Sequence, residues 1–100
     1  MPYFITTLNL EDDGRGIYIT RSRTVGFYNS FEKAEKAVEN NYGDIYECGY
    51  YNYAVIENIE EGLYQYDFKG KWYRWNEDND AFERCERPNR IEDSNFSSIG

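Results

Sequence analysis

Residues 30–42 read Ser-Phe-Glu-Lys-Ala-Glu-Lys-Ala-Val-Glu-Asn-Asn-Tyr, and this stretch decides the fold class. Its apolar side chains, at positions 31, 34, 37, 38 and 42, recur at the spacing of one helix face. Asn29 or Ser30 can cap the start, with Glu32 spaced for a capping box from Asn29, and Gly43 suits the stop. Because an amphipathic helix must bury its apolar side, the sequence predicts a helix lying on a sheet.

Segments with the composition of β-strands lie before and after the predicted helix. They are rich in β-branched and aromatic residues and are separated by turn-forming residues. Residues 21–23 read as a polar interruption, Gly26 indicates a bulge or a close backbone approach, and Lys69-Gly70 reads as a hairpin turn. The predicted strands are residues 3–10, 17–20, 24–28, 51–57, 63–68, 71–75 and 81–86.

Residues 51–57, Tyr-Asn-Tyr-Ala-Val-Ile-Glu, form the strongest of these predicted strands. The uninterrupted apolar centre at 54–56 needs cover on both faces, which favours the middle of a sheet. A chain of 100 residues leaves room for one domain. We therefore expect residues 1–100 to form a single α+β domain, an antiparallel β-sheet with one amphipathic helix packed on one face.

The composition favours binding over catalysis. The net charge is -8, which argues against nucleic acid and anionic lipid as partners and is compatible with a basic protein surface. The chain has no His, so the usual general base and the commonest zinc ligand are missing. We expect no enzymatic activity, no catalytic residues, no metal and no cofactor.

The sequence also bears on location. No apolar run approaches 18 residues, and the N-terminal residues lack the basic and apolar regions of a signal peptide. Cys48 and Cys85 stand far apart in the sequence and are most simply two free thiols. These features predict a cytoplasmic protein without a membrane segment.

One candidate site is an acidic, Tyr-rich stretch between Lys36 and Lys69. It contains no Lys or Arg, and carboxylates interleaved with Tyr could meet a basic surface on a partner protein. The alternative is a solvated face whose tyrosines belong to the core and its rim. The residues predicted to bind protein are Glu39, Asp44, Tyr46, Glu47, Tyr50, Glu57, Glu60 and Glu61.

A second candidate site combines arginines with aromatic residues. Arg gives bidentate contacts to anions and aromatic rings stack on bases, so the two together could hold a small nucleotide-like ligand. The alternative is that the arginines pair with the surplus carboxylates and that Trp72 or Trp75 belongs to the core. The residues predicted for this alternative site are Arg23, Tyr28, Trp72 and Arg74.

Several motifs resemble a family of short, uncharacterised proteins from gut Firmicutes and from their phages and mobile elements. The family pattern often has Trp and Phe before a Pro where this chain has Phe27-Tyr28-Asn29. The resemblance transfers no catalytic residue. The motifs that carry it are Arg23–Tyr28, Ser30–Val38, Asp44–Glu47, Gly49–Glu57, Glu61–Tyr64, Lys71–Trp75 and Asn95–Gly100.

What the resemblance implies is a biological setting, because small acidic phage proteins without enzymatic activity are often inhibitors of host immunity. Three hypotheses stay open at this point. The chain is an inhibitor or adaptor that binds a host protein through its acidic stretch, a binder that sequesters a nucleotide-like immune signal, or a bacterial interaction domain with neither role. A pocket between subunits would suit the second, so a homo-oligomer is compatible with it.

Overall fold

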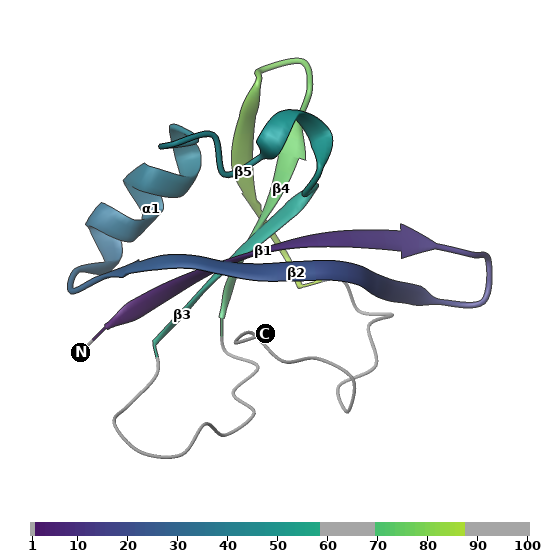
Figure 1. The fold of residues 1–100 in the computed structure, drawn as a ribbon, viewed down its shortest axis with the longest axis horizontal. Helices are drawn as coiled ribbons and strands as arrows, with labels where there is room; N and C mark the ends of the chain where they lie inside the picture. The colour runs from purple at the N-terminus through teal and green to yellow at the C-terminus, as the bar shows by residue number, and fades with distance from the viewer. Residues whose placement is uncertain (1, 59–69, 88–100) are drawn as a thin grey trace.

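The computed structural model describes residues 2–58 and 70–87. Strands and helices are segregated along the chain as expected for an α+β domain, with the helix between the second and third strands (Figure 1). The elements are β1 (Tyr3–Asp12), β2 (Ile17–Tyr28), α1 (Phe31–Glu39), the short 3₁₀ helix η1 (Glu47–Gly49), β3 (Tyr53–Asn58), β4 (Lys71–Asn76) and β5 (Ala81–Cys85).

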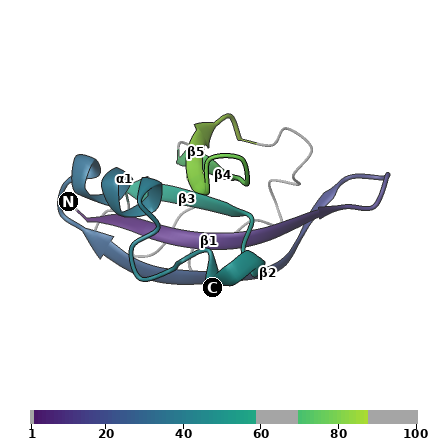
Figure 2. The same ribbon diagram turned by 90° about the horizontal axis from the view of Figure 1, so that it is seen from above.

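The strands form one antiparallel sheet in the order β2-β1-β3-β4-β5. β3 lies in the middle, and Ala54, Val55 and Ile56 are at most 2% exposed, so the predicted central strand is confirmed. α1 packs on one face of this sheet, as Figure 2 shows from above. The predicted fold class, an antiparallel sheet with one helix on one face, is therefore confirmed. The predicted strand at 63–68 and the turn residue Lys69 lie outside the described residues.

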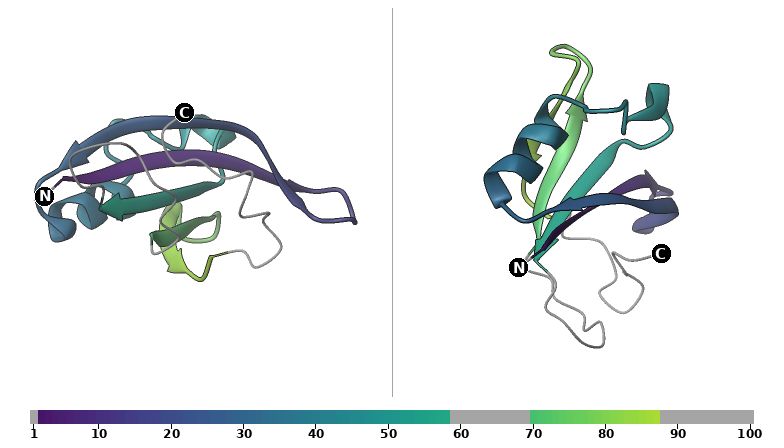
Figure 3. Two further views of the ribbon diagram at one scale, coloured as in Figure 1. Left: turned by 90° about the horizontal axis from the view of Figure 1, so that it is seen from below. Right: turned by 60° about the vertical axis from the view of Figure 1, so that its left-hand side comes forward.

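β1 and β2 form a long ribbon that extends past the start of β3 (Figure 3). The predicted break at 21–23 is wrong, because β2 runs unbroken from Ile17 to Tyr28 and Arg21 and Arg23 pair with β1. The register shifts near Gly26, so the predicted bulge is confirmed. Polar residues are tolerated at positions 21–23 because strands in an antiparallel sheet pair through their backbone groups.

The start of α1 is capped by Ser30, whose hydroxyl oxygen accepts the Lys33 N–H at 3.4 Å. The same hydroxyl donates to Glu32 at 2.9 Å. The capping box predicted between Asn29 and Glu32 is therefore wrong, since the cap lies one residue later. Its hydrogen bond satisfies an N–H that the first helical turn would otherwise leave unpaired.

The end of α1 comes at Glu39, earlier than the predicted end at residue 42. Asn41 adopts a left-handed conformation with φ of 50°, the Asn41 N–H donates to the Val38 carbonyl, and the Tyr42 N–H donates to the Ala37 carbonyl. This pair of bonds is a Schellman motif. Asn41 takes the left-handed position that was predicted for Gly43. Tyr42 is 51% exposed and therefore does not lie on the buried face of the helix.

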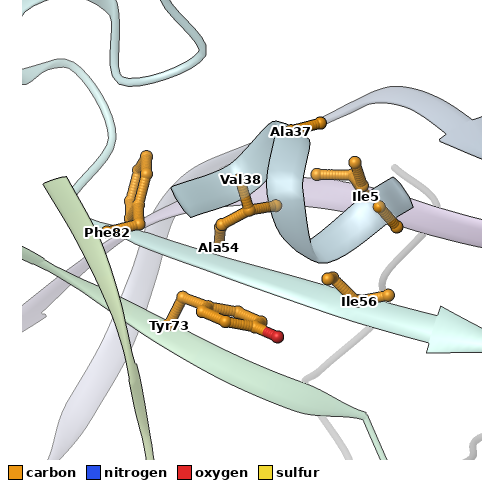
Figure 4. Packing of buried hydrophobic residues seen from close by; sticks show 8 residues of the cluster. Ile5, Ala37, Val38, Ala54, Ile56, Tyr73 and Phe82 are labelled. Carbon is orange, nitrogen blue, oxygen red and sulfur yellow. The ribbon is translucent and has the colours of Figure 1, made fainter. Parts of the chain in front are cut away.

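The core has one cluster on each face of the sheet. The cluster under α1 interleaves side chains from the helix and the strands, as Figure 4 shows for seven labelled residues. Its buried members are Ile5, Ala34, Ala37, Val38, Ala54, Ile56, Tyr73 and Phe82. On the other face the buried members are Leu8, Leu10, Val55 and Trp72.

Polar side chains at the border of the first cluster connect the helix to two strands. The buried Tyr73 hydroxyl on β4 and the Arg84 guanidinium on β5 both donate to the Glu35 carboxylate on α1. Burial raises the pKa of the Tyr73 phenol, and its hydrogen bond to Glu35 raises it further. Tyr73 therefore remains a neutral donor over the physiological range, and it is used structurally.

Candidate protein-binding surface

The segment between α1 and β3 crosses the α1-side face of the sheet and passes over β4 and β5 (Figure 1). Its course is held by Asn41, whose side-chain oxygen accepts the Tyr46 N–H at 2.9 Å and whose amide donates to Asp44 at 3.1 Å. Glu47 and Cys48 then adopt left-handed φ values of 51° and 54°. Such values turn the chain sharply, and non-glycine residues adopt them only when surrounding contacts compensate.

Tyr46 is the main contact of this segment with the sheet. Its ring stacks on Trp75 of β4 at 3.7 Å between centroids, with only 9° between the ring planes. Phe82 of β5 meets both rings edge-on, at 6.1 Å from Tyr46 and 5.1 Å from Trp75. Because Phe82 is itself buried at 1% exposure, this aromatic group ties the irregular segment to the core.

Carboxylates from two distant parts of the sequence flank this aromatic group. Asp44 and Glu47 are exposed on the crossing segment, and Glu77 and Asp80 are exposed in the turn between β4 and β5. Burial raises the pKa of Tyr46, and the charges of Glu77 and Asp80 raise it further, which shows that the turn lies within electrostatic range of the segment. We call the resulting face the acidic–aromatic surface; its members are Asp44, Tyr46, Glu47, Tyr50, Trp75, Glu77 and Asp80.

Two arginines of β2 lie at the border of the acidic–aromatic surface. The Arg21 guanidinium is 4.0 Å from the centre of the Tyr50 ring, and its Nε donates to the Tyr50 carbonyl at 3.0 Å. Arg23 forms a long ion pair with Glu47 at 3.8 Å, with both side chains well exposed. Arg21 and Arg23 thus help to position the segment. The exposed ion pair of Arg23 contributes little to this, because pairs of this kind are worth only about 0–1 kcal/mol.

The structure brings some of the predicted protein-binding residues together and separates others. Tyr46 and Tyr50 lie on the acidic–aromatic surface with Asp44 and Glu47, whereas Glu39 is exposed at the end of α1. Glu57 is only 3% exposed on β3, so it offers no exposed charge to a partner. The two remaining predicted members, Glu60 and Glu61, lie outside the described residues.

The four residues predicted for the alternative ligand site lie on different faces. Trp72 is buried at 2% exposure in the cluster opposite α1, and Arg74, two residues along the same strand, projects to that face. Tyr28 packs against the cluster under α1, and Arg23 projects toward Glu47 on that side of the sheet. These four side chains do not surround a common space.

Two hollows border the crossing segment. One, of about 520 Å³, lies where β4 and β5 run past the start of β3; the other, of about 650 Å³, lies between β2 and residues 42–48. The first is lined in part by Tyr46, Trp75, Glu77 and Glu83, and the second by Arg23, Asp44, Glu47 and their neighbours. Both are open depressions.

Trp75, Glu77, Asp80 and Glu83 were not predicted to belong to the protein-binding site. The acidic run at 77–80 was visible in the sequence as a polar loop. Because it is far from Asp44 in the sequence, its proximity to the crossing segment could not be predicted. Only the antiparallel pairing of β4 and β5, which carries the turn toward Tyr46, brings Glu77 and Asp80 near this ring.

Residues 2–58 and 70–87 hold no group of three or more His, Cys, Asp or Glu side chains placed to bind a metal ion. Over the same residues, no helix has the length and apolar character required to cross a bilayer. The chain matches no protein-family model, no curated protein and no solved structure.

Proposed function

We propose that this chain is a non-catalytic binding protein that engages a basic surface of a partner protein through its acidic–aromatic surface. The observation that carries the proposal is the stacking of Tyr46 on Trp75, which joins two acidic segments around one aromatic centre. Interfaces are enriched in Tyr and Trp at their centres, while surrounding charges select the partner and speed its approach.

The arrangement suits a protein partner better than a small metabolite. The carboxylates are spread over two segments and are exposed, so they act over an area rather than at one point. Exposed charges of one sign raise the association rate with an oppositely charged surface and lose this effect as salt rises. The resemblance to short phage proteins makes a bacterial defence protein with a basic, nucleic-acid-binding surface the first partner class to test.

The test removes charge without changing side-chain shape. The site variant carries Asp44→Asn, Glu47→Gln, Glu77→Gln and Asp80→Asn; Asn tolerates the left-handed φ values of 54° and 51° at positions 44 and 80. The control variant carries the same four-charge change at exposed acids at the end of β1, in the β1–β2 turn and after β5. These control changes are Glu11→Gln, Asp12→Asn, Asp13→Asn and Glu86→Gln.

The three proteins are immobilised and exposed to lysate of a gut Firmicute at low and at high salt, and bound proteins are quantified by mass spectrometry. We expect a basic protein that the original chain and the control variant capture at low salt and the site variant captures at least tenfold less, and we expect purified partner to reproduce this difference by calorimetry. Equal capture by site and control variants would refute the proposal.

A further inference from the structure

We infer that the hollow beside Tyr46 and Trp75 receives an arginine side chain of the partner, with the stem along the rings and the guanidinium at Glu83 and Glu77. This inference rests on the proposed function and names the chemical group that the surface recognises. Its basis is a single depression that is lined by both aromatic rings and carboxylates. A surface that attracted a partner by negative charge alone would not require this combination.

The hollow has two chemically different walls because of where β3 begins. β3 starts at Tyr53, and the residue before it, Asn52, accepts the Trp75 N–H of β4 through its carbonyl at 3.0 Å. Beyond that point the β4–β5 hairpin has no β3 neighbour, so side chains from both of its faces border the hollow. Tyr46 and Trp75 contribute from the α1 side, and Glu83 contributes from the other.

Glu83 is held in a fixed orientation before any partner binds. Asn76 donates to one of its carboxylate oxygens at 2.8 Å and Asn79 donates to the other at 2.6 Å. Asn76 is fixed in turn, because its side-chain oxygen accepts the Asp78 N–H at 2.9 Å. A carboxylate oxygen can accept more than one hydrogen bond, so both oxygens retain capacity for a bidentate guanidinium.

The hydrogen bonds from Asn76 and Asn79 lower the pKa of Glu83, so its negative charge persists below the usual pH range for Glu. An arginine is always charged, and its planar head matches a carboxylate better than a lysine ammonium does. Its apolar stem can also lie along aromatic surface while the head reaches the carboxylate. A volume of about 520 Å³ accommodates one such side chain.

The chain's own arginines leave this role open to a partner. Arg84 lines the hollow, but its guanidinium is bound to Glu35 and lies 5.6 Å from the centre of the Phe31 ring, on the helix side. Arg74 also lines the hollow and stands opposite Glu83 in the strand register, yet the hydrogen bonds that orient the two Glu83 oxygens come from Asn76 and Asn79. Glu83 thus remains a preformed acceptor on the wall of the hollow.

The test uses fluorescein-labelled hexa-arginine and hexa-lysine peptides as probes, with binding followed by anisotropy at low salt. The variant Glu83→Gln removes the charge, and Glu86→Gln is the matched control, an exposed acid close in sequence that does not line the hollow. We expect hexa-arginine to bind at least fivefold more tightly than hexa-lysine. We expect Glu83→Gln to weaken hexa-arginine binding at least fivefold and Glu86→Gln to weaken it less than twofold.

A second readout reports on the aromatic wall. The chain has two tryptophans, and Trp72→Phe leaves Trp75 as the sole one, so its emission monitors the hollow. We expect hexa-arginine to change this emission in the Trp72→Phe protein and to lose that effect when Glu83→Gln is added. If Trp72→Phe fails to fold, the anisotropy comparison decides alone.

The outcomes separate this inference from the proposed function. Equal weakening by Glu83→Gln and Glu86→Gln, with strong weakening by the four-charge site variant, would overturn the arginine site and leave the acidic–aromatic surface as the binding face. Equal binding of hexa-arginine and hexa-lysine would likewise overturn it. Hexa-arginine binding that no variant changes would overturn both.

Discussion

The half of the molecule under α1 and the half around the acidic–aromatic surface are built differently. Under α1, a capped helix lies on regular strands, and the buried side chains are mostly aliphatic. Around the acidic–aromatic surface, the chain turns through left-handed residues and is held by stacked aromatic rings and side-chain hydrogen bonds. The left-handed non-glycine residues there are Asn41, Asp44, Glu47, Cys48 and Asp80.

If the proposed function holds, this difference means that stability and recognition are assigned to separate parts of the chain. Left-handed backbone costs about 1–3 kcal/mol at a non-glycine residue, and somewhat less at Asn or Asp. The regular half must offset that cost through burial. Irregular segments on a rigid scaffold are also where binding residues are commonly found.

The largest expected effect comes from breaking the regular half. Ile56 is 2% exposed at the centre of the sheet, under α1. We expect Ile56→Ala to lower the free energy of unfolding by about 2–5 kcal/mol, because it removes buried methyl groups and leaves a cavity. Urea denaturation followed by circular dichroism measures this loss.

The folded fraction of Ile56→Ala should bind hexa-arginine as tightly as the original chain, since Ile56 does not line the hollow. A loss of stability below 1 kcal/mol, or a large change in peptide affinity, would contradict the separation of the two halves.

A smaller effect is expected at the junction between the halves. We expect Asn41→Ala to lower the free energy of unfolding by about 1–3 kcal/mol, because alanine is strained at a φ of 50° and the bonds to Tyr46 and Asp44 are lost. Asn41→Gly is the matched control, since it accepts this φ and removes only the side-chain bonds.

Hydrogen exchange locates the change at Asn41. Residues 42–50 should exchange faster in both Asn41 variants, while β3 stays protected, and Asn41→Gly should recover part of the stability that Asn41→Ala loses. Identical stability of the two variants would show that backbone strain at this position is unimportant.

The smallest expected effect concerns the two thiols. Cys48 is exposed on the crossing segment, whereas Cys85 is partly buried at the end of β5, where burial raises the pKa of its thiol. Because the thiolate is the reactive form, we expect iodoacetamide at pH 8 to alkylate Cys85 roughly an order of magnitude more slowly than Cys48. Peptide mass spectrometry at timed intervals gives both rates.

Raising the pH should narrow this difference in alkylation rate, because the thiolate fraction of Cys85 grows as the pH approaches the raised pKa of its thiol. Equal rates at pH 8 would mean that β5 opens readily, and this edge of the sheet would then be less rigid than its packing indicates.

Local chemistry explains which features could be predicted. The periodicity at 31, 34, 37 and 38 and the apolar run at 54–56 each reflect the burial needs of one element, so the helix and the central strand were predictable. The end of α1 was mispredicted because Asn and Gly both accept left-handed φ, and only the bonds made by Asn41 show which residue ends the helix.

The candidate site could be predicted only in part, because the sequence shows which residues are neighbours along the chain but not which distant residues come together. Asp44, Tyr46, Glu47 and Tyr50 are close in sequence, so their common surface was visible as a composition. The burial of Glu57 was not visible, because it depends on which neighbours cover that face of β3.

The sequence by itself determined the α+β class, the acidic character and the absence of His from the chain, because these depend on composition and local periodicity. Only the tertiary structure decided that Trp75, Glu77 and Asp80 join Tyr46, and that Trp72 lies in the core on the other face. The physical reason is that a strand places successive side chains on opposite faces, so the contacts of a residue depend on register and strand order.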